Sequence, residues 1–312
     1  MKIIQSSHDS KQRVQIIHDD KILLAVAPWY GAKLTAMKLN AGQEFHDVLW
    51  PISDADLESN AWFKQSILFP FPNRLKDGQY DFEGRSYQFP INEVEVNNQL
   101  HGMLFNAPFK VTDTRESDLE ASITLAHVYS GDLPYYPFPF VFEVTYRYYL
   151  SGFSVKFQVK NTGQERLPFG IGWHPYFQID GIGVNDYVFS SGDLEEIALD
   201  QRTSIPTGER KLIPNPVLAL NKHKLDNAYQ LKGETTYSLK GPDALRVSFR
   251  ASDSLSYLQL FTPDGGETIA IEPMTCNVNA FNNQDGLLTL DPANSFDCEV
   301  QIELTKDTNM TP

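Results

Sequence analysis

The sequence has few cysteines, few positive charges and no long apolar run. Its two cysteines, Cys276 and Cys298, cannot form a disulfide framework, and no Cys-x-x-Cys pair suggests structural zinc. Its 26 lysines and arginines face 40 aspartates and glutamates, which gives a net charge of −14. Nucleic acid and anionic membranes recruit clustered positive charge, so neither is an expected partner. The lack of a membrane-length apolar segment or a signal-peptide core predicts a cytoplasmic protein.

Motifs that several large enzyme classes require are also missing. There is no G-x-x-x-x-G-K-[ST] loop, no H-E-x-x-H zinc motif and no G-x-S-x-G nucleophile elbow. The stretch GIGVND at 181–186 lacks the last glycine of a dinucleotide-binding fingerprint. These absences argue against P-loop phosphoryl transfer, dinucleotide redox chemistry, zinc proteolysis and α/β-hydrolase acyl transfer.

Helical periodicity is scarce, and alternation of apolar and polar residues dominates instead. The stretches FVFEVTYRYYL (140–150) and SVKFQVKNTG (154–163) alternate as half-buried strands do, and 78–90 reads as a hairpin that turns at Glu83–Gly84. No low-complexity segment or repeat divides the chain. We therefore expect an all-β protein with two large sheets packed face to face, folded as a single domain over residues 1–312.

Two polar stretches interrupt apolar strands in the first third of the chain. Asn73 and Arg74 follow a Pro-Phe-Pro step, which restricts the backbone just before them. His101 precedes Gly102, a residue that allows close backbone approach. These residues are candidates for binding a ligand. A surface arginine at a turn and a histidine satisfied within the core are the alternatives.

A histidine and a glutamate stand out in two later strands. In GIGWHPYF (170–177), His174 shares its face with Gly172 and Tyr176. In TIAIEP (268–273), Glu272 points away from the two isoleucines that face the core. A carboxylate at the end of an apolar strand loses water, which raises its pKa and basicity. The residues alone leave open whether this pair meets as an acid and base, forms a sheet-edge salt bridge, or makes no contact.

Five stretches in a fixed order resemble the aldose 1-epimerase (galactose mutarotase-like) family. The resemblance extends from about residue 70 to residue 283 and implies a large twisted antiparallel β-sandwich, the galactose mutarotase-like supersandwich. The five stretches are NRLKDGQYDFEGRSYQFPINE (73–93), QLHG (99–102), HPYF (174–177), LDNAY (225–229) and IAIEP with NAFN (269–273 and 279–282).

The resemblance also implies an activity, the interconversion of the α and β anomers of a free aldose. Glu272 would act as the general base on the C1 hydroxyl, and His174 as the general acid on the ring oxygen. We expect these two groups on opposite sides of one hexose-sized hollow. The chemistry needs no metal and no cofactor. The residues implied to bind substrate are Asn73, Arg74, His101 and Asp226.

Three aromatic residues in these stretches are candidates for stacking on a sugar, with core packing as the alternative: Trp173, Tyr176 and Phe281.

The chain departs from the galactose mutarotase pattern at two places. Met103 follows His-Gly where the family usually has a second glycine, and Trp-His-Pro-Tyr-Phe replaces Asn-His-Ser/Thr-Tyr-Phe. A preference for galactose is therefore open, as is the oligomeric state. One alternative is a hexose-6-phosphate mutarotase, which would need extra positive charge at the pocket. Another is a sugar-binding module without catalysis, which would need no acid/base pair.

Overall fold

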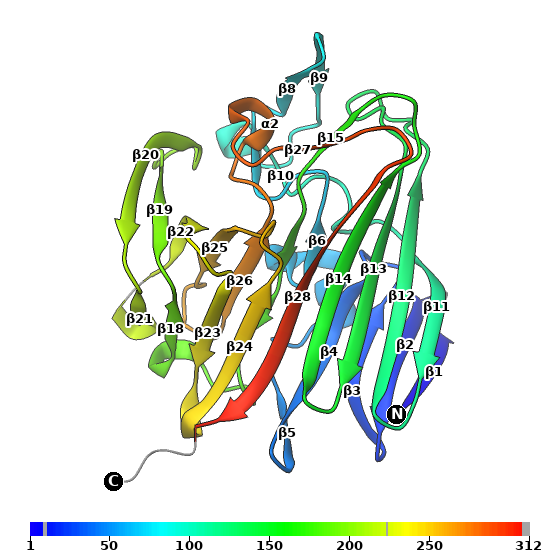
Figure 1. Ribbon diagram of the computed structural model, residues 1–312, viewed down its shortest axis with the longest axis vertical. Coiled ribbons are helices and arrows are strands. Elements are labelled where there is room, and N and C mark those ends of the chain that lie inside the picture. Colours follow the sequence, from blue (N-terminus) through cyan, green and yellow to red (C-terminus); the bar gives the residue numbers. More distant parts are fainter. Residues whose placement is uncertain (9–10, 223, 308–312) are drawn as a thin grey trace.

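The computed structural model describes residues 1–8, 11–222 and 224–307. Antiparallel strands dominate it, and the widest sheet has nine strands (Figure 1). Buried residues alternate along its central strands, as the sequence pattern predicts. In order across the sheet, the strands are β11 (Lys110–Glu116), β12 (Glu120–Tyr129), β13 (Phe140–Tyr149), β14 (Gly152–Asn161), β28 (Ser295–Lys306), β24 (Leu245–Ala251), β23 (Thr236–Lys240), β18 (Val188–Ser191) and β21 (Val217–Ala219).

A second sheet has eight strands, seven of them on one path, and carries the residues of greatest interest. Its order is β20 (Pro206–Ile213), β19 (Leu194–Leu199), β22 (Asp226–Leu231), β25 (Tyr257–Phe261), β26 (Ile269–Met274), β16 (Gly172–His174) and β6 (Ser66–Leu68), and β17 (Tyr176–Phe177) pairs with β26. All six residues of β26 are buried, so both of its faces are covered.

The N-terminal strands form a separate sheet of five strands. It consists of β1 (Lys2–His8), β2 (Lys11–His18), β3 (Lys21–Ala27), β4 (Lys33–Ala41) and β5 (Glu44–Asp47). Three two-stranded ribbons complete the β structure: β7 (Arg74–Lys76) with β10 (Asn98–Leu100), β8 (Gln79–Phe82) with β9 (Arg85–Gln88), and β15 (Leu167–Phe169) with β27 (Leu288–Leu290).

The two smaller sheets cover different halves of the nine-stranded sheet. In β13, the hydroxyl of Tyr146 donates to the carbonyl of Ala32, and that of Tyr148 donates to Lys38 in β4. At the other half, Phe177 of β17 meets Phe249 of β24 with ring centroids 4.9 Å apart. The expected β-sandwich is confirmed, but the expectation of two large sheets is too simple. A second layer made of two sheets covers the wide inner face of the first.

Helix is sparse, as expected. The helical segments are α1 (Asp54–Ser59), α2 (Ala280–Asn283) and the 3₁₀ turns η1 (Ala61–Phe63), η2 (Val94–Val96), η3 (Val184–Asp186), η4 (Leu220–Lys222) and η5 (Pro242–Ala244). Within the described residues, none of these helices is long and apolar enough to cross a membrane.

Candidate active site

A cavity of about 320 Å³ lies over one face of the eight-stranded sheet. This volume is at the small end of the range for ligand pockets. The cavity contains all six residues that the sequence predicts for the site, together with Tyr176. Its lining consists of Trp62, Phe63, Asn73, Arg74, Leu100, His101, His174, Tyr176, Asp226, Gln259, Phe261 and Glu272.

Strand register explains how His174 and Glu272 meet. Gly172 of β16 pairs with Met274 of β26, and Tyr176 of β17 pairs with Ala270. In an antiparallel register, these two pairs place His174 directly across from Glu272. Side chains at directly opposite positions share one face of a sheet. The two residues are therefore neighbours on adjacent strands, rather than on opposite sides of the cavity as expected.

The His174–Glu272 pair is buried and in contact. Nε2 of His174 lies 3.3 Å from Oε1 of Glu272, and the two residues are 6% and 2% exposed. Neither Nδ1 of His174 nor Oε2 of Glu272 has a hydrogen-bond partner among the described residues. Buried polar atoms of this kind are rare and call for an explanation. The pair therefore keeps hydrogen-bonding capacity that the described residues leave unused.

Burial acts on the two groups in opposite directions. Loss of water lowers the pKa of His174 to about 3, and the charge of Lys33 adds to the effect. Loss of water also raises the pKa of Glu272 well above its usual range. Asp226 adds to that rise, and Arg74 opposes it. Both shifts favour the uncharged forms, so a single proton shared by the pair resides on the carboxyl.

His101 is held as a hydrogen-bond donor toward the cavity. Its Nδ1 accepts the backbone N–H of Asn73 at 3.2 Å, and the backbone N–H of His101 donates to the Asn73 carbonyl. Burial, followed by the neighbouring His174, lowers its pKa well below 6.5, so the ring is neutral. With Nδ1 accepting, the ring proton resides on Nε2. Gly102 makes this turn possible, because a Cβ there would lie 2.3 Å from the carbonyl oxygen of Phe69.

Arg74 and Asp226 carry the other charges of the cavity. Nε and Nη2 of Arg74 donate to the Glu93 carboxylate at 2.8 to 3.1 Å, and Nη1 donates to Oδ1 of Asn73. Asp226 is exposed at the mouth and accepts from Nε2 of Gln259 at 2.9 Å. The cavity walls still remove its carboxylate from part of its water, which raises its pKa. Both side chains are fixed in orientation, as groups that bind hydroxyls need to be.

Sequence reasoning missed several lining residues, and for two of its three aromatic candidates the core-packing alternative holds. Trp173 and Phe281 belong to the hydrophobic core and do not line the cavity, whereas Tyr176 stacks on His174 with ring centroids 5.1 Å apart. The residues that were missed are Trp62, Phe63, Leu100, Gln259 and Phe261. Gln259 and Phe261 lie across from Glu272 and Ala270. Alternation within YLQLF could have indicated that they share a face, but not which face.

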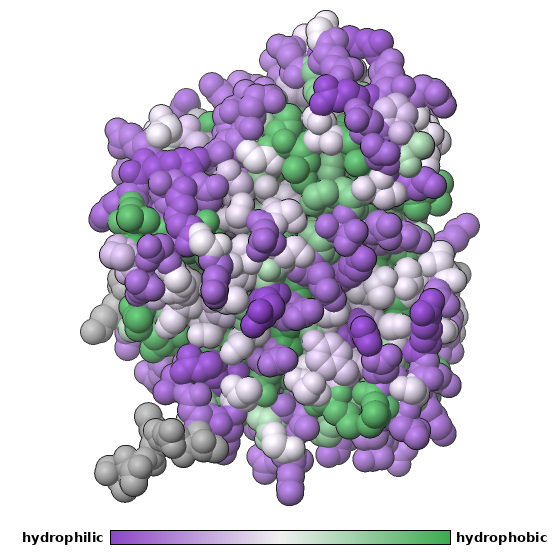
Figure 2. Space-filling model, viewed as in Figure 1, coloured by the Kyte–Doolittle hydropathy of each residue, from purple (hydrophilic) through white to green (hydrophobic). Residues whose placement is uncertain are grey.

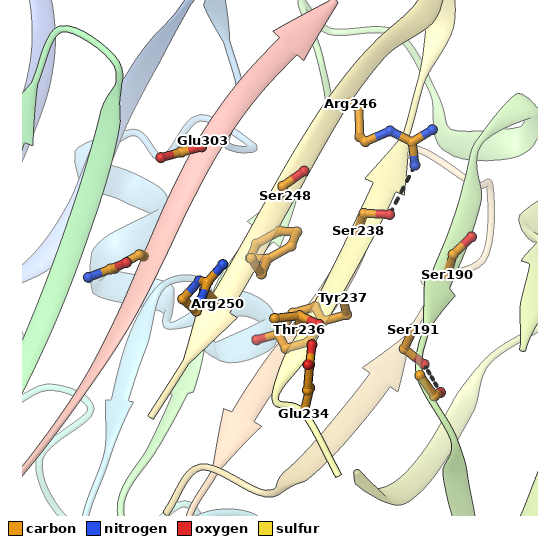
Figure 3. A pocket seen from close by; sticks show the side chains of 13 residues that line it. Ser190, Ser191, Glu234, Thr236, Tyr237, Ser238, Arg246, Ser248, Arg250 and Glu303 are labelled. Carbon is orange, nitrogen blue, oxygen red and sulfur yellow. Dashed lines mark hydrogen bonds between the residues drawn. The ribbon is translucent and has the colours of Figure 1, made fainter. Parts of the chain in front are cut away.

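A larger hollow, of about 520 Å³, lies on the outer face of the nine-stranded sheet (Figure 3). Serines from three neighbouring strands line up across it, because Ser190 pairs with Ser238 and Ser238 with Ser248. Arg250 and Glu303 lie beside this row. Hydrophilic residues cover much of the face seen in Figure 2, and hydrophobic residues form separate patches on it. None of the six predicted site residues lies in this hollow.

The aldose 1-epimerase family model matches residues 12–303, which is nearly the whole chain. Among curated proteins, the uncharacterized protein YihR of Escherichia coli (strain K12) is 28% identical over 234 residues, covering 72% of this chain and 74% of that protein. YphB of the same organism is 30% identical over 112 residues, or 36% of each chain.

Solved structures share the fold at low sequence identity. A galactose mutarotase-like protein from Clostridium acetobutylicum has a TM-score of 0.85 at 20% identity, with 98% of this chain and 99% of that chain covered. A galactose 1-epimerase from Lactobacillus acidophilus NCFM has a TM-score of 0.77 at 14% identity, with 97% and 98% covered. At these identities the likeness concerns the fold alone. The family match over residues 12–303 goes further, and the chain belongs to the aldose 1-epimerase family.

Proposed function

We propose that this protein is an aldose 1-epimerase that interconverts the α and β anomers of a free aldose. The observation that carries the proposal is the buried contact of 3.3 Å between His174 Nε2 and Glu272 Oε1, inside a cavity of sugar-binding size. A structural ion pair at a sheet edge would be solvated. This pair is enclosed and retains two buried polar atoms without a hydrogen-bond partner among the described residues.

The adjacency of the pair suits the reaction. The two oxygens that exchange protons, the C1 hydroxyl and the ring oxygen, are bonded to the same carbon, so their partners also need to lie side by side. One proton shared by the pair moves from Glu272 to His174 across their contact. Glu272 then removes the C1 hydroxyl proton as C1=O forms and the C1–ring oxygen bond breaks, and His174 protonates the departing ring oxygen.

Reclosure runs through the same groups. The C1–C2 bond rotates, the hydroxyl attacks the other face of the aldehyde, and the two residues exchange their roles. The proton count of the pair is unchanged after the cycle. His101 Nε2–H, Arg74 Nη1 and the Asp226 carboxylate provide fixed donors and an acceptor for the remaining hydroxyls. Such positioning makes the proton transfers effectively intramolecular.

A free sugar fits the cavity better than a sugar phosphate. Among the lining residues, Arg74 is the one lysine or arginine, and the bond to Glu93 already compensates its charge. Asp226 adds negative potential at the mouth. A dianion would enter this environment without a free cation to meet it.

The test is polarimetry on freshly dissolved α-aldoses, together with a binding measurement for glucose and glucose 6-phosphate. We expect faster approach to anomeric equilibrium with at least one neutral aldose, and weak or absent binding of the phosphate. Sugar binding without any rate enhancement would favour a non-catalytic binding module. Faster mutarotation of the phosphate than of the free sugar would favour the sugar-phosphate alternative.

A further inference from the structure

A tryptophan projects at the mouth of the cavity. Trp62 is 52% exposed and lies against Phe261, with ring centroids 5.7 Å apart and planes inclined by 31°. Both rings line the cavity. Single exposed apolar side chains are common on proteins, so exposure alone carries no meaning. The backbone that presents this ring supplies the second observation.

The segment that carries Trp62 is held in an uncommon conformation. Asn60, Trp62, Phe63 and Gln65 all have positive φ, at 49°, 59°, 50° and 53°. Non-glycine residues rarely adopt this region, and bulky ones least of all. Such strain persists only where the surroundings over-determine it, and it concentrates at ligand clamps and active sites.

Four hydrogen bonds fix this segment, three of them to the strands that carry His174 and Tyr176 and one to Lys33. Its start is anchored by Lys33, whose Nζ donates to Oδ1 of Asn60 at 2.7 Å. The Tyr176 hydroxyl donates to the Trp62 carbonyl at 3.1 Å. The backbone N–H of Gln65 donates to the His174 carbonyl, and the Gln65 side chain accepts from the Tyr176 N–H. The ring is therefore positioned relative to His174 itself.

Exposure increases from the reacting pair toward this ring. Glu272 and His174 are buried, whereas Asp226 and Trp62 are exposed. A sugar whose C1 meets the buried pair therefore directs its opposite end toward Trp62. Aromatic faces favour flat apolar surfaces, and the C–H face of a pyranose is one.

On the basis of the proposed function, we propose that Trp62 and Phe261 form an outer stacking subsite for the part of the substrate remote from C1. About half of the Trp62 surface is exposed, so the indole has area available for a second ring. The substrate class therefore includes reducing disaccharides whose second ring is attached at that remote end and rests on Trp62. This makes Trp62 a specificity-determining residue.

The experiment compares glucose with its 4-linked disaccharide cellobiose in the whole protein and three variants. In Trp62→Ala, we expect KM for cellobiose to rise about tenfold, equivalent to about 1.4 kcal/mol of binding free energy. The KM for glucose should rise less, and kcat should stay unchanged for both sugars. Trp62→Phe should retain most of the affinity, because the ring remains. Leu212→Ala, which removes a side chain that is 56% exposed on β20, should leave all constants unchanged.

Tryptophan fluorescence gives a binding readout that does not depend on catalysis. Cellobiose should change the emission of the unaltered protein but not that of Trp62→Phe, since the other three tryptophans do not line the cavity. A fluorescence response without mutarotation in the unaltered protein would contradict the proposed function but would still support this subsite. Active protein in which Trp62→Ala affects both sugars equally, or lowers kcat alone, would overturn the subsite. If Trp62→Ala does not fold, an unchanged fluorescence response in Trp62→Phe would overturn it.

Discussion

Two hollows of this molecule, the cavity on the eight-stranded sheet and the outer hollow on the nine-stranded sheet, differ in what surrounds them more than in how large they are. The hollow on the nine-stranded sheet measures about 520 Å³, against about 320 Å³ for the cavity on the eight-stranded sheet. The larger one is lined by side chains that water reaches, such as those of Arg250 and Glu303. The smaller one encloses Glu272 and His174 and shifts the pKa of both. Desolvation of paired ionisable groups is therefore a better guide to chemistry here than volume.

Coverage of the sheet faces accounts for the contrast. The outer face of the nine-stranded sheet is open to solvent, so its charged groups stay hydrated. Arg246, for example, is bound by Asp307 and Ser238 at the surface. The cavity face of the eight-stranded sheet is instead covered by segments around residues 62 and 73. Water is excluded there, and electrostatic interactions strengthen as a result.

The most direct test of this comparison replaces one glutamate in each hollow with glutamine. Glu272→Gln should lower kcat about 10²- to 10⁴-fold, the contribution expected of a positioned proton-transfer group. Glu303→Gln should leave kcat unchanged. Polarimetry measures the rates, and titration with sugar should show affinity within about tenfold in both variants, as a transition-state role requires. Loss of binding with kcat preserved in Glu272→Gln would contradict the base assignment.

The pH profile sharpens the comparison, because the proposed working pair holds a single proton. At low pH, kcat/KM should fall as His174 takes a second proton, near its lowered pKa of about 3. At high pH it should fall as Glu272 loses the shared proton, at a pKa raised well above 4.5. On each side of the optimum, kcat/KM should change about tenfold per pH unit. The two apparent pKa values belong to the coupled pair rather than to either residue alone. A narrow optimum between 4.5 and 6.5 would indicate ordinarily hydrated groups and contradict the burial argument.

Most of the fold and the six predicted positions of the site could be read from the sequence. Alternation along 140–150 and 154–163 predicted β13 and β14, and the motif order predicted which residues gather in one cavity. The sequence did not predict how these segments lie relative to one another. His174 and Glu272 were expected to face one another across the hollow, yet strand register makes them neighbours.

The aromatic residues show a second limit of the sequence. Trp173 and Trp62 are the same residue type, but one fills the core and the other borders the cavity. The position of Trp62 follows from positive φ angles and from bonds to Tyr176 and Lys33, which are distant in the chain. No local pattern encodes such contacts, so no periodicity argument could have found this residue.

The smallest effect concerns a buried cation behind the cavity wall. Lys33 is almost fully buried, and loss of water lowers its pKa to about 7. Unfolding restores an ordinary value near 10.5. Between these values the unfolded chain binds more protons, so the contribution of Lys33 to stability rises with pH in this window and is constant below it. Arg250 in the outer hollow is exposed and offers a matched control.

Urea unfolding of the unaltered protein, Lys33→Met and Arg250→Met at pH 7, 8 and 9 tests this difference. The free energy of unfolding of the unaltered protein, minus that of Lys33→Met, should increase with pH by at most about 1.4 kcal/mol per pH unit. The corresponding difference between the unaltered protein and Arg250→Met should not change with pH, because arginine remains charged throughout. Comparison with each variant cancels the titration of all other groups. Parallel curves for Lys33→Met would mean that its ammonium stays hydrated, and the anchor on Asn60 would then lie in water rather than in the protein interior.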